Sequence, residues 1–217
     1  LDAHAEAGEG RFRAIRQGGA RMEDPDARLL AGFAEAGLYR DPALQAGVAA
    51  LAGRGLVFEA FLFHFQLADL AELAGKAPET RIVVNHLGTP IGFGRPDGGD
   101  DAVFDAWRRE SDRLAKHPNL VMKLGGVASP VTEYDGGLRE VPPSSDQFVT
   151  ERGRYFDAAI SALGPERCLF ESNIPVDSAA ISYGTLWNAF KLIAREYGPE
   201  ASDRMLAGTA REVYGAG

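Results

Sequence analysis

The sequence predicts an α/β protein of one domain, residues 1–217, built on a parallel sheet. Two observations predict this class. Short apolar segments rich in Val, Ile, Leu and Phe recur along the chain, and an amphipathic helical pattern follows each one. The strand–helix unit occurs five times, and such alternation is typical of parallel strands joined by right-handed crossovers.

Five units are too few to close an eight-stranded barrel. The pattern therefore leaves two architectures open. One is an open, doubly wound sheet, although no glycine fingerprint for a dinucleotide follows the first predicted strand. The other is the last five units of a TIM-type (β/α)8 barrel whose first strands are absent.

Local signals place each element. Basic and apolar residues alternate at 11–17, as in a strand with one solvated face, and Pro42 suits the first turn of a helix. In chain order we expect a helix to Gly8, a strand at 11–17, a short helix at 27–36, a helix at 42–54, a strand at 56–63, a helix at 66–77, a strand at 81–86, a helix at 100–116, a strand at 119–124, a helix at 145–163, a strand at 167–170, and helices at 183–197 and 199–214.

Composition disfavours several partners. The chain has 31 acidic and 23 basic residues and a net charge of −8. This balance disfavours nucleic acid and anionic membranes, and no apolar run approaches the roughly 18–20 residues of a membrane span. The single cysteine, Cys168, fits a reducing compartment, and its apolar neighbours predict a packed core thiol. We expect a cytoplasmic protein that acts on a small molecule.

Polar residues stand where the predicted strands end. Because the carboxyl ends of parallel strands meet at one edge of a sheet, these side chains predict one site. Each also has a structural explanation: a lysine can extend to solvent from a strand, an arginine can be a solvated edge charge, and flanking phenylalanines can bury a histidine. The residues are Arg16, His64, His86 and Lys123, then Glu171, Ser172 and Asn173 after the fifth strand.

The two histidines have two alternative functions. His64 and His86 can bind a divalent metal such as Zn or Mn, or they can transfer protons near neutral pH. A hydrolytic zinc site usually has three or more protein ligands. The fifth strand ends instead in Asn173, a poor zinc ligand, with Glu171 and Asp177 as the nearest acids. Metal-free proton transfer is therefore at least as well supported as metal catalysis.

Three segments resemble a known family: Val-Val-Asn-His-Leu-Gly-Thr-Pro at 83–90, Asn-Leu-Val-Met-Lys-Leu-Gly-Gly at 119–126, and Cys-Leu-Phe-Glu-Ser-Asn-Ile-Pro-Val at 168–176. In order and spacing they are similar to the amidohydrolase family 2 group, and the resemblance extends from residues 11–16 to 208–214. That group contains metal-dependent hydrolases and decarboxylases, and lactonases that act on dicarboxylate or sugar lactones.

The resemblance implies a (β/α)8 barrel in which His86 matches the sixth-strand histidine and His64 lies near the fifth-strand one. Two departures stand out. The first-strand His-x-His pair of the family is absent, so the chain is expected to be N-terminally incomplete. The eighth-strand Asp is replaced by Asn173, which puts metal binding and the role of that Asp as base in question. Some lactonases of the group work without metal.

The leading hypothesis is a hydrolase of a small carboxylated or lactone-type substrate. His86 would polarise the carbonyl or protonate the leaving oxygen, and Glu171 or Asp177 would activate water, with Asn173 beside them. Arg16 would hold a substrate carboxylate, and His64 and Lys123 would complete substrate binding. The long loops at 88–99 and 125–145 would cover the pocket.

Two alternatives remain. The first is a metal-dependent decarboxylase of the same fold, with His64 and His86 among the ligands. The second is a non-catalytic barrel remnant that binds a ligand or a partner. A sheet that lacks its first strands has exposed edges, which soluble proteins normally protect. Such a chain is expected to aggregate, to form homo-oligomers or to need a complementing segment.

Overall fold

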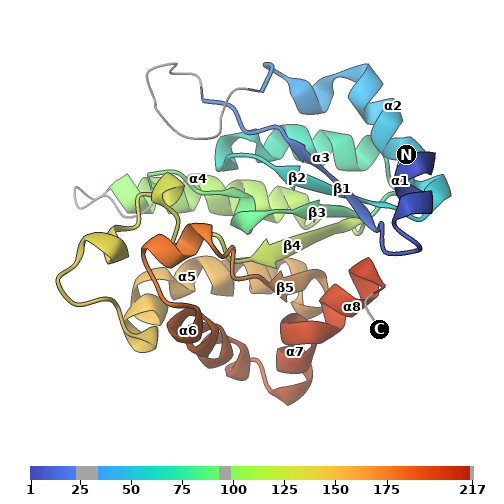
Figure 1. The fold of residues 1–217 in the computed structure, drawn as a ribbon. Coiled ribbons are helices and arrows are strands. Elements are labelled where there is room, and N and C mark those ends of the chain that lie inside the picture. The colour runs from blue at the N-terminus through green and yellow to red at the C-terminus, as the bar shows by residue number, and fades with distance from the viewer. Residues whose placement is uncertain (23–33, 93–98, 216–217) are drawn as a thin grey trace.

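The computed structural model describes residues 1–22, 34–92 and 99–215. Five parallel strands form one sheet in the order β1-β2-β3-β4-β5 (Figure 1). In a doubly wound sheet, the order in which successive strands are added reverses at the switch point. The described strands show no such reversal, so the parallel α/β class is confirmed and the doubly wound alternative is wrong. The strands are β1 (Ala14–Gly18), β2 (Val57–Phe61), β3 (Ile82–Val84), β4 (Leu120–Leu124) and β5 (Cys168–Phe170).

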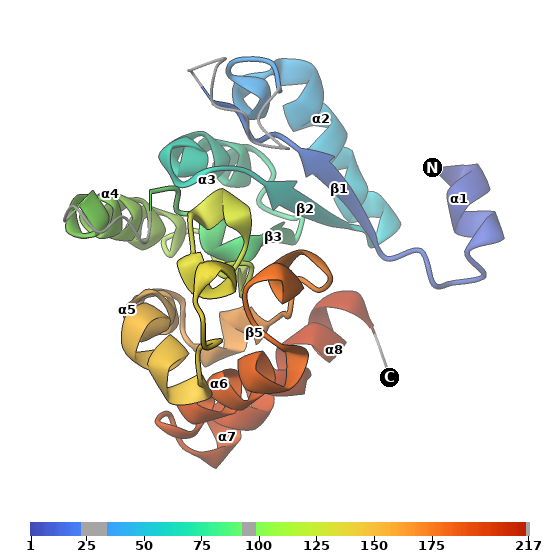
Figure 2. The same ribbon diagram turned by 60° about the vertical axis from the view of Figure 1, so that its left-hand side comes forward.

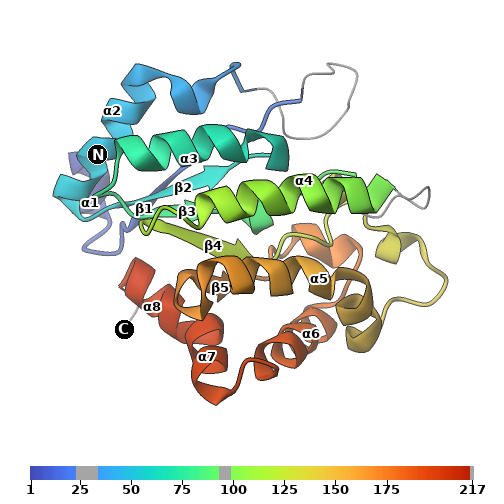
Figure 3. The same cartoon turned by 180° about the vertical axis from the view of Figure 1, so that it is seen from behind.

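The connecting helices cover one face of this sheet. Figure 3 shows α3, α4 and α5 in front of the strands, and Figure 2 shows the same helices along the outer side of the curved sheet. Crossovers of one hand, made in one direction, place successive helices on the same side. These helices therefore leave the other face of the sheet uncovered, and α8 (Thr209–Tyr214) packs against part of it. The connecting helices are α2 (Pro42–Leu51), α3 (Leu67–Lys76), α4 (Gly99–Leu114) and α5 (Ser145–Leu163).

Side-chain alternation gives the two faces different chemistry. On the helix face, residues such as Phe58, Val84 and Met122 join the main apolar core. On the opposite face, four buried residues form a second apolar cluster, and α8 (Thr209–Tyr214) packs against it. Two residues further along the strands, the same face carries charged side chains. The four residues of the second cluster are Val57, Val83, Val121 and Leu169.

The helix termini follow the expected capping chemistry. Pro42 is the first residue of α2, and Asp41 accepts a hydrogen bond from the Leu44 N–H at 2.8 Å. Ser144 caps α5 in a capping box with Gln147. Such caps satisfy amides that the helix itself leaves unpaired. The two helices therefore begin close to where the sequence predicts them.

Two predictions need adjustment. The single helix expected at 199–214 is divided into α7 (Pro199–Asp203), a π-helical segment (Arg204–Gly208) and α8. The loop expected at 125–145 contains two short 3-10 turns, Pro130–Thr132 and Asp135–Leu138. Most of the helix expected at 27–36, and part of the loop at 88–99, lie outside the described residues.

Three remaining elements agree with the sequence. Helix α1 (Asp2–Ala7) ends at Gly8, and α6 (Tyr183–Arg195) begins after its cap Ser182. Cys168 is fully buried, and burial raises the pKa of its thiol to about 12, as expected of a core thiol. In the described part of the chain, none of the helices has the length and apolar character needed to cross a bilayer.

Candidate active site

His86 follows the short strand β3 and occupies a left-handed turn. Strict alternation would send its side chain to the helix face, where Val84 lies. A φ of 57° turns the ring instead to the opposite face, where its centroid lies 5.6 Å from that of Phe61. Left-handed backbone costs about 1–2 kcal/mol at a non-glycine residue, and such strain tends to occur at functional sites. The conformation of this turn therefore places His86 in the site.

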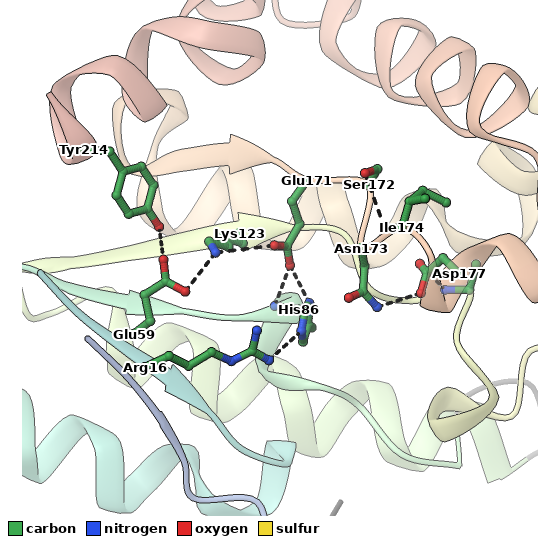
Figure 4. Close-up of polar contacts among 11 residues, drawn as sticks. Arg16, Glu59, His86, Lys123, Glu171, Ser172, Asn173, Ile174, Asp177 and Tyr214 are labelled. Atoms are coloured by element: carbon green, nitrogen blue, oxygen red, sulfur yellow. Dashed lines mark hydrogen bonds and ion pairs between the residues drawn. The ribbon is translucent and has the colours of Figure 1, made fainter. Parts of the chain in front are cut away.

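Glu171, directly after β5, holds His86 at two points (Figure 4). Its Oε1 lies 2.5 Å from His86 Nδ1 and 3.2 Å from the His86 backbone nitrogen, which donates to it. Burial alone would raise the pKa of Glu171. The hydrogen bond from His86 and the charge of Lys123 outweigh burial, so this pKa lies below its usual value. Glu171 is therefore an ionised partner of the imidazole.

Arg16 approaches the other nitrogen of His86. Its Nη2 lies 3.2 Å from His86 Nε2, and its guanidinium lies 5.2 Å from the centre of the Phe61 ring. A guanidinium can only donate hydrogen bonds. His86 Nε2 is consequently the acceptor, and Nδ1 carries the proton that is donated to Glu171. The two contacts together assign the neutral imidazole one tautomer.

Lys123 of β4 lies between two carboxylates on the same face of the sheet. Its Nζ is 3.1 Å from Glu59 Oε2 and 3.5 Å from Glu171 Oε2. On the far side, Tyr214 Oη of α8 donates to Glu59 Oε1 at 2.5 Å. The side chains of Lys123, Glu59 and Glu171 are 14%, 13% and 18% exposed. Mostly buried charges of this kind require partners, and each has one here.

Two glycines after β4 make the contact between His86 and Glu171 sterically feasible. A Cβ on Gly125 would lie 2.0 Å from the carbonyl oxygen of Glu171, and one on Gly126 would lie 2.5 Å from the ring of His86. Gly126 also has a φ of +69°, which side chains disfavour. The Gly-Gly pair therefore allows the backbone of this loop to approach both residues.

Asn173 and Asp177 form a pair beside this cluster (Figure 4). Asn173 Nδ2 donates to Asp177 Oδ1 at 2.8 Å, and the Ala128 N–H donates to Oδ2 at 3.2 Å. Asp177 is fully buried, and burial raises its pKa to about 6 despite these hydrogen bonds. The carboxylate is thus enclosed by protein donors, and Asn173 lies three residues after the end of β5.

His64 takes part in a different set of contacts. It begins a 3-10 turn three residues after Phe61, the last residue of β2, and its Nδ1 accepts a hydrogen bond from the Ile91 N–H at 3.2 Å. Burial lowers its pKa to about 4, so the ring is neutral. Its other contacts are with Thr89 and Phe65. The described contacts of His64 thus join it to the 86–92 loop.

The side chains of the site do not form a set of ligands that fits a divalent metal ion. Both nitrogens of His86 are engaged, and the partner of Nε2 is the guanidinium cation of Arg16. Asn173 directs its amide nitrogen, which is not a ligand, at Asp177. Across residues 1–22, 34–92 and 99–215, no group of three or more His, Cys, Asp and Glu side chains could hold a metal. Protein ligands for a catalytic zinc usually number three.

The structure thus brings together Arg16, His86, Lys123 and Glu171, and it adds two residues that the sequence did not single out. Glu59 had a detectable signal, because it is a charge in the middle of the apolar segment 56–63, on the same side as Val57. Tyr214 had none, since it lies 155 residues from Glu59 in the sequence. Only the packing of α8 on the sheet brings it there.

Comparison with known proteins identifies the family of this chain. A family model described as amidohydrolase matches residues 2–216. The chain belongs to the amidohydrolase family, which confirms the resemblance seen in the sequence. The family match covers nearly the whole chain and therefore includes every residue of the site.

Individual relatives extend this result. An uncharacterized protein of Sinorhizobium fredii is 32% identical over 193 residues, which are 89% of this chain and 57% of that protein. A protein of Burkholderia multivorans named L-fucono-1,5-lactonase is 33% identical over 178 residues, 77% of this chain and 54% of that protein. The chain spans little more than half the length of these relatives.

Solved structures share the fold. A crystal structure of an amidohydrolase from Burkholderia multivorans with bound HEPES has a TM-score of 0.79 at 24% identity, covering 99% of this chain and 69% of that one. A second crystal form of that description, with bound zinc, has a TM-score of 0.75 at 24% identity, covering 94% and 64%. At this identity the likeness concerns the fold.

Proposed function

We propose that this protein is a hydrolase of small lactone-type or carboxylated substrates, with His86 as the residue that moves the proton. One observation carries the proposal: Glu171 binds the Nδ1 side of His86 and leaves Nε2 as an acceptor beside Arg16. A carboxylate that orients a histidine is the usual way to prepare an imidazole as a general base. Relatives named L-fucono-1,5-lactonase and L-rhamnono-gamma-lactonase favour sugar lactones.

The geometry revises the roles expected from the sequence. Glu171 is held by three groups and has a lowered pKa, so it suits orientation of the imidazole better than activation of water. Once Arg16 turns its N–H groups from Nε2 to the substrate carbonyl, His86 Nε2 takes a proton from the water that attacks this carbonyl, and Glu171 stabilises the imidazolium formed. His86 then returns the proton to the ring oxygen as the C–O bond breaks, which yields a hydroxy acid. This second step retains the acid role expected of His86.

Arg16 is the substrate-binding residue in this scheme. Its guanidinium lies beside Nε2 and extends from an exposed residue of β1, so its N–H groups can bind the carbonyl oxygen on which negative charge develops, or a substrate carboxylate. Asn173 and Asp177 would support the wall of the site. Asp177, fully buried, is less suited than His86 to meet water directly.

We further propose that the five β/α units belong to a TIM-type (β/α)8 barrel. The sequential order of the strands supports this proposal, as do helices on one face and a TM-score of 0.79 to an amidohydrolase structure. In such barrels the site lies at the carboxyl ends of the strands. His86 and Glu171 lie after the ends of β3 and β5, while Arg16 lies within β1, two residues before its end.

The alternative of a metal-dependent decarboxylase requires His64 and His86 to share an ion. No described contact joins the two histidines, and the guanidinium of Arg16 lies at Nε2 of His86, the nitrogen that Glu171 does not contact. The present contacts therefore favour metal-free hydrolysis. The remaining alternative, a non-catalytic remnant, would be favoured if the wild-type protein hydrolysed none of a broad panel of lactones.

The test is hydrolysis of a panel of sugar lactones and carboxylated lactones, with and without a chelator. We expect His86→Ala to lower kcat by about 100- to 10,000-fold, the usual contribution of a general base. Glu171→Gln should also lower kcat strongly, since it removes the charge that stabilises the imidazolium. Unchanged turnover by His86→Ala would overturn this role, and activity lost on chelation and restored by zinc would favour the metal alternative.

A further inference from the structure

A chain of three residues stands behind the His86–Glu171 pair and does not itself reach the reacting atoms. It begins at Tyr214 of α8, continues through Glu59 of β2 and ends at Lys123 of β4 (Figure 4). We propose that these are positioning residues, which hold the Glu171 carboxylate in the one orientation that fixes His86 as its Nδ1–H tautomer. The inference rests on the proposed function for its kinetic consequence.

The two oxygens of Glu171 have different partners, and this asymmetry is the first step of the argument. Oε2 faces Lys123 Nζ at 3.5 Å, while Oε1 accepts hydrogen bonds from His86 Nδ1 and the His86 N–H. Lys123 attracts one oxygen and so leaves the other toward the imidazole. Without the ammonium, the carboxylate can rotate and the bond to Nδ1 loses its fixed geometry.

Lys123 is in turn held from the opposite side. Glu59 Oε2 lies 3.1 Å from Nζ, closer than Glu171 does. With carboxylates on both sides, Lys123 is not free to bind the substrate, which was its expected role. Glu59 and Lys123 cancel in charge, as do Glu171 and Arg16, so the mostly buried cluster is neutral overall and needs no further counter-ion.

Tyr214 fixes the far end of the chain. Its hydroxyl donates to Glu59 Oε1 at 2.5 Å, and Lys123 Nζ lies 5.8 Å from the centre of its ring. Ala210 and Val213 anchor α8 in the second apolar cluster, so the position of Tyr214 is set by packing. Both oxygens of Glu59 are then occupied, and the carboxylate cannot turn away from Lys123.

The experiment reads the tautomer of His86 directly, by 15N NMR of the labelled imidazoles at a pH where they are neutral. In the wild-type protein we expect the Nδ1–H form. In Tyr214→Phe, Glu59→Gln and Lys123→Met we expect a mixture of tautomers, each variant being made in an Arg16→Ala background so that Glu171 alone selects the tautomer; Arg16→Ala by itself should keep the Nδ1–H form. A purely structural role would lower stability in these variants without changing the tautomer.

Kinetics supply a second readout. Loss of a residue that orients a functional group typically lowers activity by about 10- to 100-fold. We expect that loss in kcat for lactone hydrolysis, with KM little changed, and partial recovery in Lys123→Arg, which keeps the charge. If the wild-type protein hydrolyses no lactone, the proposed function fails, while the NMR measurement still decides this inference.

Tyr197→Phe is the matched control. Tyr197 Oη also donates to a carboxylate, Asp157 Oδ1 at 2.8 Å, and this exposed hydrogen bond joins the segment after α6 to α5. This variant should keep the wild-type tautomer and activity. Should Lys123→Met fail to fold, Tyr214→Phe and Glu59→Gln still test whether the chain of residues positions Glu171. A wild-type His86 signal in both folded variants, with turnover equal to that of Tyr197→Phe, overturns the inference.

Discussion

His86 and Glu171 show how a few contacts define the chemistry of a residue. They are separated by 85 residues in the sequence, and their side chains meet at 2.5 Å. The same imidazole could bind a metal, donate a proton or accept one. The partners distinguish the two ring nitrogens, because Glu171 occupies Nδ1 and the guanidinium of Arg16 can only donate to Nε2.

Asp177 shows the opposite case, a carboxylate whose environment favours its protonated form. Burial raises its pKa to about 6, from an ordinary value of 3.8. The folded protein therefore binds this proton more tightly than the unfolded chain does. The free energy of unfolding contributed by the group is greatest below pH 4 and falls as the pH rises to 6, by an amount on the order of 3 kcal/mol.

We predict that Asp177→Asn removes this dependence. The difference in free energy of unfolding between wild type and variant, measured by urea titration from pH 4 to pH 7, should move in favour of the variant as the pH rises. The Asn side chain loses one acceptor toward the Ala128 N–H, which is a pH-independent penalty. A difference that stays constant over the whole range would show that Asp177 is not protonated in the folded protein near pH 5.

At the scale of elements, the loops that follow the strands shape the site. The turn at His86 has positive φ angles at four successive residues, from His86 to Thr89. It redirects His86 from the helix face to the opposite face. The loop after β4 uses Gly125 and Gly126 to approach the same ring and Glu171. Strand alternation alone would not produce this arrangement.

Gly126→Ala tests the contact between these two loops. The added methyl group would lie 2.5 Å from the His86 ring at a left-handed backbone position, so the ring must move. We expect kcat for lactone hydrolysis to fall by about 100-fold, the scale seen when a reacting group is misplaced by about 1 Å.

The control for this variant is Gly184→Ala in α6, where a methyl group meets no atom within 4 Å. Alanine favours a helix over glycine by about 1 kcal/mol. Gly184→Ala should therefore keep full activity and melt at a slightly higher temperature. Equal activity of the two variants would mean that the 125–126 loop can relax without disturbing His86.

At the scale of the whole molecule, the sheet separates two kinds of packing. The helices bury its outer face in the main core, while α8 and a four-residue apolar cluster close part of the other face. The polar site lies above that small cluster. One face of the sheet therefore carries both an apolar cluster and the candidate site, and the apolar residues support the charged side chains.

Leu169→Ala measures how much this face contributes. Leu169 is 4% exposed and belongs to the small cluster. Truncation should lower the free energy of unfolding by about 2–5 kcal/mol. Leu138→Ala, at a position that is 90% exposed, should change it by less than about 0.5 kcal/mol. Urea unfolding measures both, and equal values would show that α8 does not pack on Leu169 in solution.

Much of the fold was predictable because its signals are local. Alternating apolar segments, the proline at the start of α2 and the Ser144 cap act within a few residues, so the sequence places those elements well. The broken helix at 199–214 was missed, since its π-helical segment has no distinct local signal. The residues at the strand ends were predictable as a group because parallel strands end at one edge.

By itself the sequence determined the α/β class, the parallel sheet, the family and four of the residues that meet in the site. Tertiary structure alone decided their contacts. It paired Glu171 with His86, placed Lys123 between two carboxylates and brought in Glu59 and Tyr214. The reason is physical: a proton's position depends on distances of a few ångströms between side chains far apart in the chain, and only packing sets those distances.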